Sequence, residues 1–296
     1  MAYMDDFRQA GKLAKETLTY GTSLIRSGAS YTEIIRNIYA KIHELGAEPA
    51  FPPQMALNET AAHFMPGPNE DIVLDDQLVK LDIGVSVNGA IGDTATTVDL
   101  SGRWNDLVQA SRDALDTATD MIEVGMELRE VGKAIQEAIA SHDDYTSIKN
   151  LSGHGLAPYT IHCAPTIPNF DNGNTATFEP NMTFACEPFA TNGKGLIRES
   201  GDGWIFRIQQ KKPIRNPVAR RILAQAETFN GLPFSLFELD TEKVPGFKLR
   251  VALKQLEQLD IIENYGPLVE EAGGMVSQAE HSILLDDEGN KFITTK

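Results

Sequence analysis

Two aspartates on neighbouring segments of the sequence could bind a metal ion together. Residues 78–87 and 90–100 each alternate apolar and polar side chains, and the Asn-Gly pair at 88–89 between them is a strong signal for a two-residue hairpin turn. A turn at these positions places Asp82 and Asp93 on one face of the hairpin as diagonal neighbours, within roughly 8 Å. Both carboxylates could then bind one cation or a close pair.

The alternative for each aspartate is a polar residue at an exposed sheet edge. Two convergent carboxylates repel each other and raise one pKa, whereas a divalent cation turns their proximity into binding. We therefore favour a metal site, provided that no bulge changes the facing of the strands. The opposite face, which we expect to lie in the core, carries Leu81, Ile83, Val85 and Val87.

Two glutamates interrupt apolar segments in the same way. Glu187 follows the apolar run 182–186, and Glu280 lies within 275–284. An unpaired carboxylate is costly to bury, so each needs a partner, unless the residue ends its strand and faces water. Three separate strands thus carry a misplaced acid.

Histidines complete the set of candidate residues. His154 lies between two glycines, which allow a close approach of the backbone, although a histidine in such a loop is more often structural or exposed. His63 and His162 are two further candidates, whereas His43 and His142 lie on helical patterns and are expected at the surface. Oxygen ligands with one imidazole suit Mn, Fe, Co or Zn.

The elements that must position these side chains follow from hydrophobic periodicity. Ser30 and Glu33 are in capping-box register, and Gly46 ends the helix that they begin. A change of pattern after Pro213 indicates a small helical insert, after which the main domain is completed. The expected helices are 3–28, 30–45, 106–123, 128–141, 217–230 and 247–259; the expected strands are 78–87, 90–100, 182–190 and 274–285; 51–68 is loop-like and 152–174 is rich in Gly and Pro.

Composition limits the classes of function. The 296 residues, 42% of them hydrophobic, can form one large domain or one domain with an insert. A net charge of -16 argues against stable nucleic-acid binding. Acids in the first residues and the lack of a long apolar run argue against secretion and membrane spanning. Cys163 and Cys186 form no C-x-x-C pair, which favours the cytoplasm.

Taken together, these residues resemble the methionine aminopeptidases, whose pita-bread fold is shared with Xaa-Pro peptidases and creatinase. The resemblance covers nearly the whole chain and rests on ordered motifs. These motifs are Leu81-Asp82-Ile83-Gly84, Gly92-Asp93-Thr94-Ala95, Gly153-His154-Gly155, Ile161-His162, Glu187-Pro188-Phe189-Ala190-Thr191 and Ala279-Glu280-His281.

The resemblance implies an α+β pita-bread fold and a hydrolase that removes the initiator methionine from new proteins during their maturation, preferring small second residues. It implies two divalent metal ions and a role for each motif residue. Asp82 would bind one metal, His154 and Glu187 mainly the other, and Asp93 and Glu280 both. Glu187 would also act as general base, His162 would stabilise the oxyanion, and His63 would contact the scissile amide. Phe51 and Ile161 resemble the walls of the methionine pocket, and the substrate's free α-amine would coordinate a metal.

The subtype and boundaries also follow from the resemblance. The insert, winged-helix-like and expected at 213–270, looks like that of type II enzymes, between a first catalytic part at 1–212 and final strands at 271–296. The lack of an N-terminal extension looks archaeal. Cys163 and Cys186 stand where small apolar residues are expected, which raises the question of oxidation.

Two other functions are alternatives. An Xaa-Pro peptidase of this fold usually carries an extra N-terminal domain, for which the chain looks too short. A non-catalytic protein of the same fold would have lost the metal ligands, which are present here. We expect nascent N-termini as partners and a monomer. The native metal, the range of second residues, the oligomeric state and any ribosome contact stay open.

Overall fold

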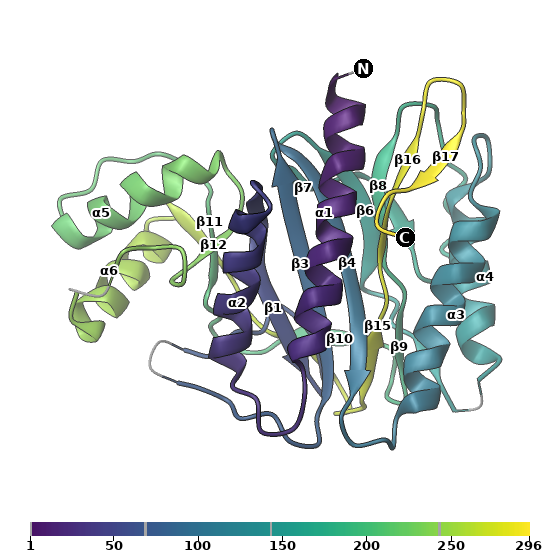
Figure 1. Cartoon of the computed structure of the whole chain (residues 1–296), viewed down its shortest axis with the longest axis horizontal. Coiled ribbons are helices and arrows are strands. Elements are labelled where there is room, and N and C mark those ends of the chain that lie inside the picture. Colours follow the sequence, from purple (N-terminus) through teal and green to yellow (C-terminus); the bar gives the residue numbers. More distant parts are fainter. Residues whose placement is uncertain (1, 68–69, 143, 242–243) are drawn as a thin grey trace.

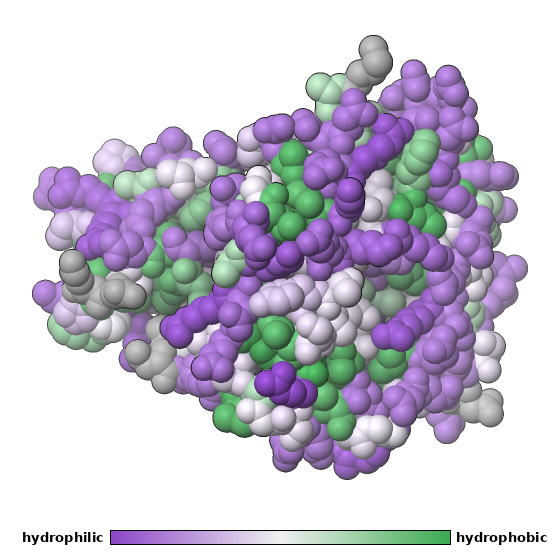
Figure 2. Space-filling model, viewed as in Figure 1, coloured by the Kyte–Doolittle hydropathy of each residue, from purple (hydrophilic) through white to green (hydrophobic). Residues whose placement is uncertain are grey.

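The computed structural model describes residues 2–67, 70–142, 144–241 and 244–296. Met1, and Pro68 at the end of the expected loop, lie outside the described residues. Four helices lie together on one side of the strands (Figure 1). They are α1 (Ala2–Leu24), α2 (Tyr31–Glu44), α3 (Asn105–Met121) and α4 (Leu128–Ala140). Figure 2 shows mostly hydrophilic side chains on this helical side, with separate hydrophobic areas between them.

The helix boundaries follow local signals. The Ser30 side chain accepts a hydrogen bond from the Glu33 backbone N–H and caps α2, and Gly46 takes a left-handed φ of 73° just beyond its end. The first helix ends at Leu24, four residues before the expected boundary. Among the described residues, no helix combines the length and the apolar character that a membrane span requires.

Two antiparallel sheets carry the main body. The first has the order β1-β3-β4, and the second has the order β17-β16-β8-β6-β7. Alternate residues of β3 pack against α1 and α2, where Leu81, Ile83 and Val85 are fully buried as expected. The strands are β1 (Glu48–Leu57), β3 (Leu78–Val87), β4 (Ala90–Asp99), β6 (Ser152–Ala157), β7 (Thr160–Pro168), β8 (Thr183–Cys186), β16 (His281–Leu285) and β17 (Lys291–Ile293).

Shorter strands join these sheets around one side of the molecule. They form the sheets β10-β14-β2 and β15-β9-β5. The Ala95↔Glu280 bridge connects β4 to the chain between β15 and β16. These strands are β2 (Thr60–Ala62), β5 (Thr146–Ser147), β9 (Phe189–Thr191), β10 (Ile197–Glu199), β14 (Leu268–Glu270) and β15 (Val276–Gln278).

The expectations of a loop at 51–68 and of a loop around His154 were wrong. The loop expected at 51–68 contains β1 and β2, because β1 is an edge strand that tolerates Pro52 and Pro53 where its register shifts. The Gly-rich region 152–174 contains the hairpin of β6 and β7. Glycine is needed there for close packing, since a Cβ on Gly153 would lie 2.3 Å from the Ala185 carbonyl oxygen.

A further group of elements lies to one side of the main body (Figure 1). Its side chains form a separate hydrophobic cluster that includes Phe206, Leu253 and Ile262. Both expected helices are present: the first ends at Ala226 and continues as a 3-10 helix, and the second has the expected length but begins and ends one residue earlier. The elements are β11 (Ile205–Ile208), α5 (Pro217–Ala226), the 3-10 helix η1 (Glu227–Phe229), β12 (Phe234–Ser235), α6 (Gly246–Gln258) and β13 (Ile262–Tyr265).

Candidate active site

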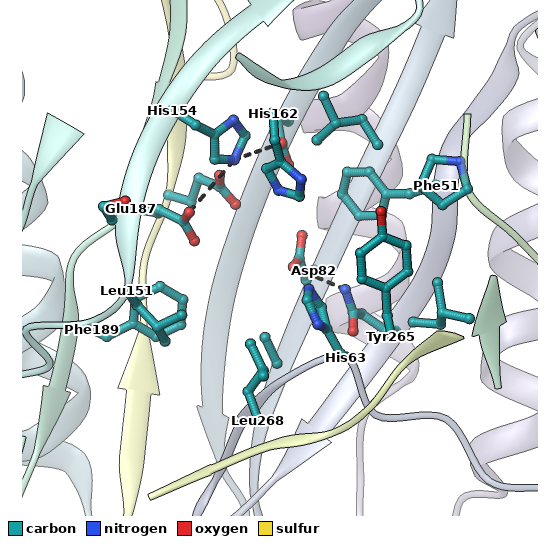
Figure 3. A pocket seen from close by; sticks show the side chains of 18 of the residues that line it. Phe51, His63, Asp82, Leu151, His154, His162, Glu187, Phe189, Tyr265 and Leu268 are labelled. Carbon is teal, nitrogen blue, oxygen red and sulfur yellow. Dashed lines mark hydrogen bonds and ion pairs between the residues drawn. The ribbon is translucent and has the colours of Figure 1, made fainter. Parts of the chain in front are cut away.

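One pocket, with a volume of about 490 Å³, brings together all nine side chains singled out in the sequence (Figure 3). Successive side chains of a strand point to opposite faces of its sheet. On β3, the neighbours of Asp82 pack towards α1 and α2, whereas Asp82 itself lines the pocket. The pocket therefore lies on the sheet face away from these helices. The nine are Phe51, His63, Asp82, Asp93, His154, Ile161, His162, Glu187 and Glu280.

The hairpin has the expected register. Asp82 pairs with Ala95 and Gly84 with Asp93, and the pairing runs through the turn without a shift. Glu280 joins this hairpin at Ala95, whose carbonyl oxygen accepts a hydrogen bond from the Glu280 N–H at 3.1 Å. Asp93 and Glu280 are each 2% exposed. The two strands and the returning chain therefore fix three carboxylates together.

His154 lies on β6 and not in a loop. Its Nε2 is 3.6 Å from Glu187 Oε1 and 3.9 Å from Asp93 Oδ2. Asp93, His154 and Glu280 each offer a ligand atom within 4.8 Å of the others. The expected strand 182–190 breaks between β8 and β9 at Glu187, which frees this side chain to turn into the pocket.

Burial and mutual repulsion make the charged forms of these four carboxylates unfavourable. Burial raises the pKa of Asp82 to about 7. Burial, followed by repulsion from neighbouring carboxylates, raises the pKa of Asp93, Glu187 and Glu280 well above the ordinary range. A divalent cation among these groups would offset both effects.

The donor atoms fit such a cation. Buried Asp82 Oδ1 has no hydrogen-bond partner among the described residues. A buried carboxylate oxygen without a partner is costly, and a metal ion would supply the missing interaction. Four carboxylates and one imidazole form a hard donor set that suits Mn, Fe, Co or Zn.

His63 and His162 line the same pocket, so both candidate catalytic histidines approach the carboxylates. The pKa of His63 is lowered to about 4, mainly by burial and to a smaller extent by the charge of His162. His63 has a left-handed φ of 59°, and its ring lies edge-on to Tyr265 at 5.4 Å. His162 packs edge-on to His154 at 4.4 Å, and burial lowers the pKa of both rings. Neutral imidazoles thus face the acids.

The apolar wall of the pocket includes Phe51 and Ile161, which belong to one hydrophobic cluster. Gly84 provides the space for the Phe51 ring, because a Cβ there would lie 2.3 Å from Phe51 Cε1. Cys163 also lines the pocket, whereas Cys186 is buried.

Several pocket residues were missed from the sequence. Tyr265 and Leu268 come from the segment expected as the insert, and Gln54 comes from the segment expected as a loop. Gln54 is the cross-strand partner of Asp82, a relation that only the register of β1 with β3 reveals. Gln278 is hidden behind the pocket, where its Nε2 donates to Glu187 Oε2 at 3.4 Å.

The two helical histidines differ. His43 is exposed, as expected. The expectation for His142 was wrong in part, because its ring is 15% exposed and contacts both Asp106 and Asp113 of α3 at 2.9 Å. The two aspartates lie about two turns apart on α3, and the ring lies between their carboxylates.

Comparisons with known proteins agree on one family. The model of metallopeptidase family M24 matches residues 5–211. The chain is 40% identical to a methionine aminopeptidase of Methanocaldococcus jannaschii and 38% identical to one of Archaeoglobus fulgidus, each match covering 97% of both chains. Among solved structures, a methionine aminopeptidase from Thermotoga maritima is similar in fold, with a TM-score of 0.72 and 21% identity over 100% of this chain and 97% of that one.

Proposed function

This chain belongs to metallopeptidase family M24, and from this premise we propose that it removes the initiator methionine from new proteins. It has the pita-bread fold and is a metal-dependent aminopeptidase, a hydrolase that resembles the archaeal type II enzymes along nearly their whole length. The Xaa-Pro peptidase and the non-catalytic protein are not favoured, because the relatives at this level of identity are methionine aminopeptidases.

The observation that carries the proposal is the convergence of five donor side chains in one pocket. They come from segments spread between residues 82 and 280, and burying four carboxylates together without a cation is costly. We propose that they hold two divalent ions, with Asp93 and Glu280 shared between them. The five are Asp82, Asp93, His154, Glu187 and Glu280.

A bound divalent cation lowers the pKa of water from 15.7 to about 7 and so supplies the nucleophile. The chain's own residues do the remaining work. The Glu187 carboxylate takes the proton from the attacking water, and the His162 ring donates a hydrogen bond to the carbonyl oxygen as it gains charge. His63 contacts the scissile amide and assists the leaving amine.

Phe51 and Ile161 form the walls against which the methionine side chain packs. The pocket volume of about 490 Å³ is large enough for a residue of this size. The requirement for a free terminal amine would restrict cleavage to the first peptide bond.

We further propose that residues 213–270 are an insert between the catalytic parts 1–212 and 271–296. The family match that ends at residue 211 and most of the separate hydrophobic cluster support this division. Phe206 of the cluster precedes residue 213, however, and β14 at the end of the segment pairs with β2 of the main body. Nascent N-termini are the proposed substrates and the cytoplasm the proposed location. A monomer stays a prediction, and any ribosome contact stays open.

Protein loaded with Mn or Co and given Met-Ala-Ser beside Gly-Pro-Ala tests the proposal. We expect cleavage of Met-Ala-Ser alone, and cleavage of only the proline peptide would contradict the assignment. Asp93→Ala and Glu280→Ala should each abolish nearly all activity, because either change removes a shared ligand. Substantial activity in either variant would refute the proposed site.

A further inference from the structure

Gln54 enters the pocket because β1 is irregular. Phe51 lies opposite Gly84 on β3 and Gln54 lies opposite Asp82, with a register shift between them. Two residues three positions apart in a regular strand point to opposite faces, so the shift at 52–53 lets both line the pocket. Gln54 is therefore the direct cross-strand neighbour of a proposed metal ligand.

The amide group of Gln54 is only half satisfied. Its Nε2 donates to Asp82 Oδ2 at 3.3 Å, and the residue is 4% exposed. Its Oε1 is buried and has no hydrogen-bond partner among the described residues. Reversing the amide would place Oε1 against the Asp82 oxygen, two acceptors in contact, so Asp82 fixes the orientation. The pocket thus contains a buried acceptor that lacks a donor.

The substrate of the proposed function offers few donors at this depth. The thioether of methionine is a weak acceptor and the scissile carbonyl oxygen is an acceptor, so neither can donate. The free terminal amine carries N–H groups, and the scissile amide carries one. Because Gln54 lies beside a proposed metal ligand and the free amine is the donor proposed to coordinate a metal, the amine is the better match.

We propose that Gln54 Oε1 accepts a hydrogen bond from an N–H of the substrate's free terminal amine. This inference rests on the proposed function and adds a residue that recognises the amine directly. Gln54 then selects for a free N-terminus in addition to the metal, and it orients the first residue with its side chain towards Phe51, on the same strand.

Gln278 provides a matched control within the same chain. It is also a buried glutamine, 2% exposed, whose Nε2 donates to a proposed ligand, Glu187. Its Oε1 likewise has no partner among the described residues. Gln278 does not line the pocket, however, so a substrate amine cannot reach it. A change at Gln278 disturbs the carboxylates without removing an amine acceptor.

The test compares two ligands that differ only in the amine. Calorimetry on manganese-saturated protein measures the affinity of L-methioninamide and of 4-(methylthio)butanamide, which keeps the side chain and the amide N–H but lacks the amine. Gln54→Leu should weaken binding of methioninamide about tenfold and leave the amine-free compound unchanged. Gln278→Leu should weaken binding of methioninamide much less than Gln54→Leu does, because it removes no acceptor for the amine.

An equal loss for both compounds in Gln54→Leu would overturn the proposal, since it would point to the scissile N–H. A loss confined to methioninamide that Gln278→Leu reproduces to the same extent would overturn it too, since it would point to a role through the metal ligands alone. Manganese affinity measured for each variant separates a lost ion from a lost hydrogen bond. Gln54→Met, of similar length and without an acceptor amide, gives the same test if the leucine variant does not fold. If wild-type protein neither binds methioninamide nor cleaves Met-Ala-Ser, the proposed function fails instead.

Discussion

Gly84→Ala is expected to push the Phe51 ring into the pocket. The new Cβ would lie 2.3 Å from Cε1 and 2.4 Å from Cδ1 of Phe51. Non-bonded carbon atoms pack at about 3.5–4.0 Å, so the ring must move by more than about 1 Å. Phe51 is 8% exposed within a hydrophobic cluster that includes Phe7 and Ile161, and the open pocket gives the ring its easiest direction of movement.

The size of the effect follows from this displacement. Overpacking of a dense core costs about 1–3 kcal/mol. Unfolding entropy near 2.1 cal/mol/K per residue then gives a fall in Tm of about 2–5 °C for a chain of 296 residues. A pocket that is too narrow by about one methyl group should raise KM for Met-Ala-Ser about tenfold or more.

The assay combines thermal unfolding with steady-state kinetics on manganese-loaded protein. Gly246→Ala is the control, because a Cβ there has no heavy atom within 4 Å. Phe51→Leu in the Gly84→Ala background should recover part of the lost Tm, since the smaller side chain leaves room for the methyl group. An unchanged Tm and KM in Gly84→Ala, or a double variant no more stable than the single one, would refute the reasoning.

Four further outcomes are expected. Burial raises the pKa of Glu238 to about 7. Its contribution to stability is therefore full below the ordinary pKa of 4.5 and is lost as the pH rises through about 7. Glu238→Gln should remove this contribution from the pH dependence of the free energy of unfolding, measured in urea between pH 5 and 8. Hydrogen bonds that the ring donates to the carboxylates of Asp106 and Asp113 raise the pKa of His142. Its contribution to stability is therefore full below pH 6.5 and is lost as the pH rises through the folded pKa. His142→Gln should destabilise the protein by at most about 1 kcal/mol at pH 6 and by less at pH 9, and an equal loss at both pH values would count against the ion pair. The Glu270 carboxylate accepts from four backbone N–H groups of two loops, so Glu270→Gln should cost about 3 kcal/mol in urea unfolding at pH 7, and a loss below about 1 kcal/mol would contradict this role. Protein expressed from this sequence begins Met1-Ala2 and so presents a small second residue; after incubation with manganese its intact mass should lack Met1, and retention of Met1 would count against the specificity.

The sequence was informative where the determinants are local. A two-residue turn fixes the register of its hairpin, so Asp82 and Asp93 could be placed together from the pattern alone. His154 was assigned to a loop because glycines usually mark loops, whereas here they allow β6 to pack closely against β8. Gln54 could not be found, since its neighbour Asp82 is set by a bulged pairing between distant segments.

Glu187 and Glu280 lie between these cases. The sequence shows that a charge interrupts each apolar segment, but not that each strand breaks at that residue. The break matters because it allows the side chain to leave the regular alternation and face the pocket. Such breaks depend on tertiary pairing, which periodicity along one segment does not report.

Hydrogen bonds between β4 and residues near β16 mean that the site can form only late in the synthesis of the chain. The Ser282 hydroxyl bonds the backbone N–H and C=O of Asp93 at 2.7 and 2.8 Å across 189 positions, and Thr94 bonds the Glu280 carbonyl oxygen across 186. Closing a loop of this length is slow compared with forming the hairpin. A ribosome-bound chain must therefore release residues as far as Ser282 before its own catalytic centre can assemble, so a copy that has not reached this point is inert towards N-termini nearby.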